Sequence, residues 1–227
     1  MKVKLSSVAV LTICLLFLAS GAFADSIPVA NPSFETPPPP PGYNNFCGGG
    51  CEYTTGVPIP GWVTTGYDTG QWIPASYHGN YAYNGITLAY TCLGSPGGGT
   101  DCGTISQDVL TKAVAGHTYT LTVEILHRFD VPMGGVAQLT LNGAPVAMAT
   151  GGDLGVGSWN KYTAHFTATG AEAGQELGIL LSSNGLGQGD FDYVQMSVVP
   201  ERSNLAMLLG FGIFNLAAVF SFRRKLT

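Results

Sequence analysis

Apolar and polar residues alternate along a segment in the second half of the chain. In residues 117–126, HTYTLTVEIL, every second residue from Tyr119 to Ile125 is apolar, with threonine or Glu124 between them. A period of two residues is typical of a strand with one buried and one solvated face. The pattern therefore predicts antiparallel strands. The same alternation recurs in three later segments, residues 162–166, 177–181 and 191–199.

The dipeptide Asn142-Gly143 lies between two apolar segments and is the strongest short signal for a β-hairpin. No stretch of residues 25–198 keeps a helical period over three turns. Many strands without helices between them favour two packed sheets over one open sheet. We therefore predict a single all-β domain over residues 25–198, built as an antiparallel β-sandwich.

The first 24 residues have the order of parts of a secretory signal peptide. Lys2 and Lys4 are basic, residues 8–18 are mostly apolar, and Ala22-Phe23-Ala24 fits the small-residue cleavage pattern. We expect cleavage before Asp25, and therefore export of the domain that follows.

The last 29 residues combine a short polar motif, an apolar run and a basic end. Residues 205–222 carry no charge, and as a helix with a rise of about 1.5 Å per residue they would span roughly 27 Å, close to the thickness of a bilayer core. By the positive-inside rule the basic end would stay in the cytoplasm. The tail thus predicts a C-terminal transmembrane helix, which would hold the domain on the periplasmic side of the inner membrane.

This tail resembles the PEP-CTERM sorting signal of Gram-negative bacteria. The resemblance covers residues 199–227, and the third motif position is Arg202 where the family has proline. It implies that an exosortase-type enzyme processes the chain and releases it to the cell surface or the medium. A permanent membrane anchor is the alternative. The residues that carry the resemblance are Pro200, Glu201, Arg223, Arg224 and Lys225.

The charge balance excludes one class of partner. Between Asp25 and Pro200 there are 13 acidic residues and three cations, Lys112, Arg128 and Lys161, a formal net charge of −10. Nucleic-acid binding needs clustered lysine and arginine to neutralise phosphates, so we expect no nucleic-acid partner. Charged residues make up only 10% of the chain, against about 25% in ordinary domains, and glycine is abundant. This composition suits an extracellular β-module.

Four cysteines remain after removal of the signal peptide: Cys47, Cys51, Cys92 and Cys102. An even number of cysteines in an exported chain predicts disulfides, and four allow three pairings. We expect the local pairs, Cys47 with Cys51 and Cys92 with Cys102, because each brackets a glycine-rich loop. Zinc is disfavoured by the spacings and by an oxidising compartment.

One acidic residue lies in an apolar pattern near the end of the domain. Asp192 shares its strand parity with Val194, Met196 and Val198, which predicts a place on the core face. A buried carboxylate is costly unless it is paired or bound to a metal, and the domain offers few cations. Calcium, which prefers carboxylate and carbonyl oxygens, would resolve the conflict.

Three short motifs give a second resemblance. Residues 31–35 (NPSFE), Gly61-Trp62 and residues 191–194 (FDYV) look like carbohydrate-binding jelly rolls of the galactose-binding-like type. The resemblance implies that the first and last strands are neighbours and that a structural calcium joins Glu35 to Asp192. The alternative is that Glu35 caps a turn and Asp192 accepts backbone N–H groups.

Candidate ligand-binding residues come from the aromatic-rich stretch before residue 90 and from the segment after residue 126. Tyrosine and tryptophan rings are good platforms for sugars, and an arginine fork can hold hydroxyl or carboxylate groups. The alternatives are a core position for Trp62 and a structural ion pair of Arg128 with Asp130 or Asp153. The candidates are Trp62, Trp72, Tyr77, Arg128 and Asp130.

The sequence contains no HExxH, GxSxG or P-loop motif. An acid pair such as Glu124 with Asp130 could serve a glycosidase, but nothing in the sequence places the two across a sugar. We therefore expect no enzyme. The predicted function is an exported surface or matrix protein whose sandwich binds carbohydrate or exopolysaccharide. A structural biofilm protein without a small ligand and a glycan-active enzyme are the alternatives.

Overall fold

The computed structural model describes residues 24–92 and 102–200. The predicted signal peptide, the transmembrane helix at 205–222 and the motif residues from Glu201 onward lie outside the described residues. Within the described ranges, no helix has the length and apolar character needed to cross a membrane. Asp25–Val198 forms one compact unit.

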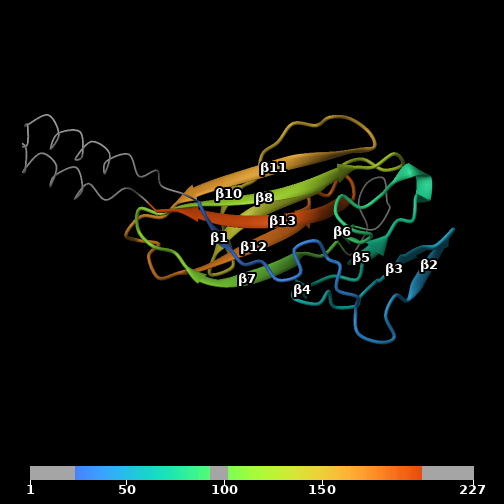
Figure 1. Cartoon of the computed structure of the whole chain (residues 1–227), viewed down its shortest axis with the longest axis horizontal. Helices are drawn as coiled ribbons and strands as arrows, with labels where there is room; N and C mark the ends of the chain where they lie inside the picture. Colours follow the sequence, from blue (N-terminus) through green and yellow to red (C-terminus); the bar gives the residue numbers. More distant parts are fainter. Residues whose placement is uncertain (1–23, 93–101, 201–227) are drawn as a thin grey trace, which may run out of the picture. The chain divides into compact units, whose positions relative to one another are not determined.

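Two antiparallel sheets make up this unit (Figure 1). The larger has eight strands in the order β11-β8-β13-β6-β5-β3-β2, with β1 paired to β13; the smaller has the order β10-β9-β12-β7-β4. The only helical segment among the described residues is the 3-10 turn η1 (Tyr77–Gly79). The strands are β1 (Asp25–Ile27), β2 (Asn45–Gly48), β3 (Cys51–Tyr53), β4 (Val63–Thr64), β5 (Thr69–Ile73), β6 (Leu88–Thr91), β7 (Ile105–Lys112), β8 (Thr118–His127), β9 (Gly135–Leu141), β10 (Ala144–Met148), β11 (Ser158–Thr167), β12 (Glu176–Ser183) and β13 (Gly189–Val199).

The core lies between the two sheets and is built by the predicted alternation. The apolar residues of β8 from Tyr119 to Ile125 are fully buried, and they pack against Leu177, Ile179 and Leu181 of β12. Each such side chain contributes about 1.5–3 kcal/mol on burial. The prediction of an all-β antiparallel sandwich is confirmed.

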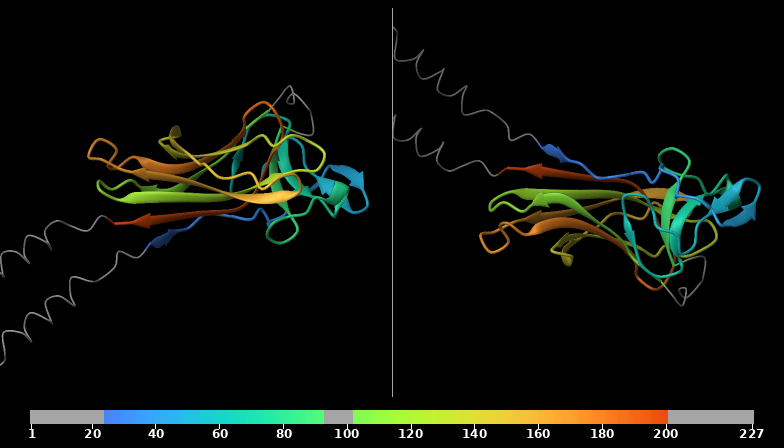
Figure 2. Two further views of the ribbon diagram at one scale, coloured as in Figure 1. Left: turned by 90° about the horizontal axis from the view of Figure 1, so that it is seen from above. Right: turned by 90° about the horizontal axis from the view of Figure 1, so that it is seen from below.

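The hairpin turn at Asn142-Gly143 and the pairing of the first and last strands also agree with the expectations from the sequence. Asn142 and Gly143 connect β9 to β10, and both have positive φ, 47° and 79°, as a type I′ hairpin turn requires. The first and last strands are neighbours, because Asp25 pairs with Val198 and Ile27 with Met196. Figure 2 shows β1 running beside the end of β13.

The predicted disulfides are present in the structure: Cys47 is joined to Cys51, and Cys92 to Cys102. The first closes the hairpin of β2 and β3.

One expectation about β13 is wrong. Asp192 does not share the core face of Val194 and Met196, because Tyr193 has a φ of 50° and shifts the alternation by one residue. As a result Phe191 joins the core, and Asp192 is buried on the opposite face of the sheet.

That opposite face carries a second apolar cluster. Even-numbered positions of β8 point there, so Leu126 packs away from the core residues Val123 and Ile125. We call this side of the eight-stranded sheet the outer face. The buried members of its cluster are Cys51, Trp72, Leu88, Tyr90, Leu126 and Trp159.

Candidate functional site

A cavity of about 220 Å³ lies against the outer-face cluster. Strands β3, β5 and β6 supply aromatic walls, and residues that follow β8 and precede β13 complete the lining. Aromatic side chains together with a few polar groups are typical of the lining of a small-molecule site. Lining residues include Tyr53, Trp72, Tyr77, Tyr90, Arg128 and Gln188.

Arg128 is held rigidly in the cavity wall. Its Cζ atom lies 4.6 Å from the centroid of the Trp72 ring. Its Nε and Nη2 atoms donate to the two carboxylate oxygens of Asp130 at 2.9 and 2.7 Å. Burial works to raise the pKa of Asp130, but the hydrogen bonds and charge of Arg128 outweigh it and lower that pKa below its ordinary value.

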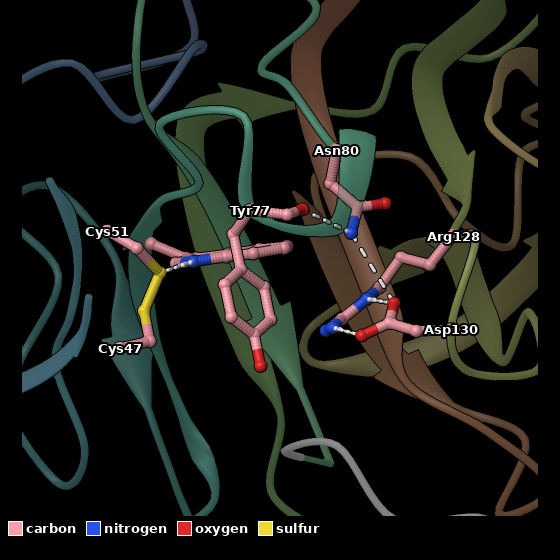
Figure 3. The surroundings of a disulfide bond; sticks show 7 residues. Cys47, Cys51, Tyr77, Asn80, Arg128 and Asp130 are labelled. Carbon is pink, nitrogen blue, oxygen red and sulfur yellow. Dashed lines mark hydrogen bonds and ion pairs between the residues drawn. A yellow bond between two sulfur atoms is a disulfide. The ribbon is translucent and has the colours of Figure 1, made fainter. Parts of the chain in front are cut away.

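Asn80 ties the 3-10 turn to this ion pair (Figure 3). Its Nδ2 atom donates to the carbonyl oxygen of Tyr77 at 3.0 Å and to Oδ1 of Asp130 at 3.4 Å. The backbone N–H of Phe129 donates to Oδ1 of Asn80. The Tyr77 side of the cavity and the Arg128 side are thereby fixed relative to each other.

Behind the lining residue Gln188 lies a completely buried carboxyl group, that of Asp190. The Gln188 Nε2 atom donates to Oδ1 of Asp190 at 2.6 Å, while Oδ2 of Asp190 is buried and has no hydrogen-bond partner within residues 24–92 and 102–200. Burial raises the pKa of Asp190 to about 6; the charge of Arg128 opposes this rise and that of Asp130 adds to it. Asp190 is therefore protonated far more readily than an ordinary aspartate.

Tyr90 forms the floor of the cavity beside these groups. Its hydroxyl donates to the carbonyl oxygen of Thr54 and lies 3.3 Å from Oγ1 of Thr55. Burial raises the pKa of Tyr90, so the phenol stays neutral. Residue 70 must be glycine for β5 to lie this close to Thr54, because a Cβ there would come within 2.2 Å of the Thr54 carbonyl oxygen.

A family model described as HpiC1 cyclase matches residues 25–197, three quarters of the chain. The chain belongs to the HpiC1 cyclase-like family. Comparison with curated protein sequences gives no match.

Solved structures of similar proteins share the fold of this chain. An apo-form cyclase from Fischerella sp. is 23% identical, with a TM-score of 0.61, over 81% of this chain and 100% of that one. A cyclase from Fischerella sp. TAU is 22% identical, with a TM-score of 0.59, over 80% and 100%. At these identities they establish the shared fold. A xylan-binding domain from Paenibacillus barcinonensis has a TM-score of 0.44 at 12% identity over 81% and 100%, too remote to bear on function.

Membership of the HpiC1 cyclase-like family corrects one expectation. The absence of familiar hydrolase motifs predicted that the chain is no enzyme, and this prediction is wrong, because the family model that matches residues 25–197 is that of an enzyme, a cyclase. The motifs that were sought belong to hydrolysis and nucleotide chemistry, which ring closure does not need.

Four of the five candidate ligand residues of the sequence come together at the cavity: Trp72, Tyr77, Arg128 and Asp130. Trp62 lies in the main core instead, where its ring centroid is 5.2 Å from that of Phe34 and its Nε1 donates to the Asn31 carbonyl oxygen. The ion pair of Arg128 is with Asp130, while Asp153 contacts His127 at 3.0 Å.

Two important cavity groups, Gln188 and Asp190, were not singled out from the sequence. The signal was present in residues 188–192, QGDFD, where two aspartates flank a core phenylalanine. Only the pairing of Asp190 with Tyr90 shows that its side chain shares the outer face.

The proposed calcium ligands lie near each other but are engaged with backbone donors. Asp192 accepts the N–H groups of Asn84 and Tyr193 at 2.8 and 2.6 Å, and Glu35 accepts those of Ile86 and Thr87 at 3.0 and 2.8 Å. Burial raises the pKa of Asp192 to about 7, and the charge of Glu35 adds to the rise. Nowhere in residues 24–92 and 102–200 do three or more acidic, histidine or cysteine side chains gather as metal ligands.

Proposed function

We propose that this chain is a cyclase and that ring closure takes place in the outer-face cavity. The observation that carries the proposal is the buried Asp190 carboxyl behind Gln188, a lining residue of the aromatic cavity, with one oxygen that has no hydrogen-bond partner among the described residues. The family to which the chain belongs supports it.

Ring closure of an unsaturated substrate can be started by a proton. Asp190 would give its proton from Oδ2 to one carbon of a double bond, forming a C–H bond and leaving a carbocation. A second double bond would attack this cation, forming the new C–C bond. Loss of a proton to the Asp190 carboxylate would restore the acid, so substrate and product are isomers. A carboxyl whose pKa is raised by burial suits this role.

The aromatic walls would stabilise the positive charge. The faces of tryptophan and tyrosine rings attract cations, most strongly where water is excluded. Trp72 and Tyr77 line the cavity, and the Trp72 ring already contacts one cation, the Arg128 guanidinium. Because Asp130 neutralises Arg128, the fixed charges do not repel a cationic intermediate outright. In this proposal the reacting double bond would lie against the Gln188 side of the cavity, because Gln188 is the lining residue bonded to Asp190.

The test uses the native host. Deletion of the gene should let the uncyclised substrate accumulate, and the cell extract then supplies it. Purified full-length protein added to this extract should convert one compound into another of identical mass and different retention time, as measured by liquid chromatography with mass spectrometry. Absence of any such isomer pair would refute the proposal.

A second candidate function, carbohydrate binding, is favoured by the aromatic rings beside Arg128 and Asp130. Tyrosine and tryptophan faces stack on sugar CH groups, and the ion pair offers polar contacts. A glycan array distinguishes the two: specific retention that is lost in Trp72→Ala, without any isomerisation, would favour binding.

We also propose export and sorting. Lys2, Lys4 and the Ala22-Phe23-Ala24 site support secretion, and the order of the tail over residues 199–227 supports exosortase processing after a stage anchored in the inner membrane. The mature protein would then reach the cell surface or medium. Mass spectrometry of protein from the host should find an N-terminus at Asp25 and a C-terminus near Ser203. A chain that still ends at Thr227 would leave only the permanent anchor.

A further inference from the structure

The disulfide between Cys47 and Cys51 lies in the wall of the cavity. Cys47 lines the cavity, and Cys51 is buried in the outer-face cluster. The Nε1 atom of Trp72 donates to the Sγ atom of Cys51 at 3.2 Å (Figure 3 shows the disulfide beside Tyr77). The sulfur therefore contacts the aromatic side chain that stacks on Arg128.

Without this bond the hairpin that carries the sulfur would be weakly held. β2 is the edge strand of its sheet, and β3 pairs with β5 through only two residue pairs, Glu52–Ile73 and Tyr53–Trp72. The connecting residues Gly48, Gly49 and Gly50 all have positive φ, a conformation that glycine adopts and leaves at little cost. A short two-stranded ribbon is at best marginally stable alone.

We propose that the Cys47–Cys51 disulfide is a positioning element of the site: it fixes the Cys51 sulfur, which orients the Trp72 indole over Arg128. The inference rests on the proposed function in one respect: it takes the cavity wall formed by Trp72 to serve ring closure. Reduction by a dithiol breaks the S–S bond, adds two electrons and two protons to give two thiols, and oxidises the reagent to its own disulfide. The hairpin then loosens, Trp72 loses its fixed acceptor, and Arg128 becomes accessible.

The second disulfide supplies a matched control. Cys92 and Cys102 also join two parts of the chain, but among the described residues neither lines this cavity, and the Trp72 indole donates to Cys51. Loss of either disulfide would lower the stability of the domain in general. Only loss of the Cys47–Cys51 bond is expected to change the accessibility of Arg128.

The experiment measures the reaction of phenylglyoxal with Arg128 in the full-length protein, followed by peptide mass mapping. Compared are wild type, the double variant Cys47→Ser/Cys51→Ser and the control Cys92→Ser/Cys102→Ser. We expect the labelling rate of Arg128 to rise roughly three- to thirtyfold in the first variant, the range that loss of a cation–π contact allows. The control should label like wild type. If the first variant fails to fold, the Cys92→Ser/Cys102→Ser protein measured before and after reduction with a dithiol under native conditions replaces it, because that protein lacks the second disulfide.

Trp72→Phe tests the route of the effect. It keeps an aromatic ring but removes the indole N–H that donates to Cys51. The labelling rate of Arg128 in this variant should therefore exceed that of wild type before reduction and should not change on reduction. The effects of the substitution and of reduction would then be non-additive. Equal labelling in wild type and in the Cys47→Ser/Cys51→Ser variant would overturn the proposal, as would an equal rise in the control. This outcome is independent of whether any substrate is cyclised, so the inference and the proposed function can fail separately.

Discussion

The guanidinium of Arg128 lies between the ring of Trp72, 4.6 Å from its Cζ atom, and the carboxylate of Asp130, which accepts two of its hydrogen bonds. One buried cation thus joins the aromatic wall of the cavity to its polar side. The arrangement fixes the position of both walls, and it makes the cation costly to remove.

Arg128→Gln should therefore destabilise the domain. Removal of one partner of a buried ion pair costs about 3–5 kcal/mol. The Asp130 side chain is 23% exposed, and solvent lessens the penalty of leaving it unpaired. We expect a loss of roughly 2 kcal/mol in the free energy of unfolding, measured in urea. The matched control is Lys112→Gln, the loss of an exposed cation, expected to change it by less than about 0.5 kcal/mol. Equal effects would contradict the buried role of Arg128.

Stability should fall as pH rises, because of Asp190. Its folded-state pKa of about 6 is above the ordinary 3.8, so the native state binds this proton more tightly than the unfolded chain. The resulting stabilisation is complete below pH 3.8 and is lost as pH rises through 6, about 1.4 kcal/mol for each unit of difference in pKa.

Asp190→Asn removes the titrating group and should flatten the curve of unfolding free energy against pH from 4 to 8. Some slope will remain, since Asp192 titrates in the same direction with a pKa of about 7. Urea midpoints at several pH values provide the measurement. A wild-type curve whose slope Asp190→Asn leaves unchanged would contradict a raised native-state pKa of Asp190.

Gly70→Ala should destabilise the wall behind Tyr90. The new Cβ would lie 2.2 Å from the Thr54 carbonyl oxygen and 2.5 Å from its Oγ1, so β5 must shift away from residue 54. Overpacking of this kind costs about 1–3 kcal/mol, occasionally more. Gly152→Ala is the control, because its Cβ would meet nothing within 4 Å and its φ is not positive. Similar melting temperatures for both variants would mean that β5 adapts freely.

The two sheets of the fold could be predicted because their strands alternate between a solvent-exposed and a buried face. The alternation in residues 117–126 gave β8 and its buried side, and Asn142-Gly143 gave the β9–β10 turn. The shift at Tyr193 could not be predicted, since a positive φ at a tyrosine has no signature in the sequence. That shift moves Asp192 to the other face of the sheet.

The candidate site could be predicted only in part, because the sequence does not show which face of a sheet each polar residue occupies. Residue type alone singled out Trp72 and Arg128, since a tryptophan near glycine-rich loops and a rare cation are conspicuous. Asp190 resembles any strand aspartate until its pairing with Tyr90 places it on the outer face. Enzyme function could not be found from motifs, because the proposed ring closure by a buried acid would need no metal-ligand or nucleophile spacing.

Calcium binding through Glu35 and Asp192 remains a prediction. The two carboxylates hold the segment from Asn84 to Thr87 from both sides, and their mutual repulsion would be relieved by a cation. Calcium at a hundredfold excess over Kd would stabilise the domain by about 2.7 kcal/mol, a rise of roughly 5–11 °C in Tm. Chelator should therefore lower Tm, and Asp192→Asn should remove the response. A melting curve that chelator leaves unchanged would mean that backbone N–H groups alone satisfy Asp192.

The central claim, that this chain closes rings by proton donation from Asp190, is tested most directly by the rate of isomer formation. The compound that accumulates in the deletion host would be incubated with full-length wild type, Asp190→Asn and the exposed control Lys112→Gln, with folding checked by circular dichroism. We expect isomer from wild type and control at equal rates, and a rate lower by about 10²–10⁴ in folded Asp190→Asn, the range for loss of a general acid. Undiminished turnover by Asp190→Asn would contradict the account.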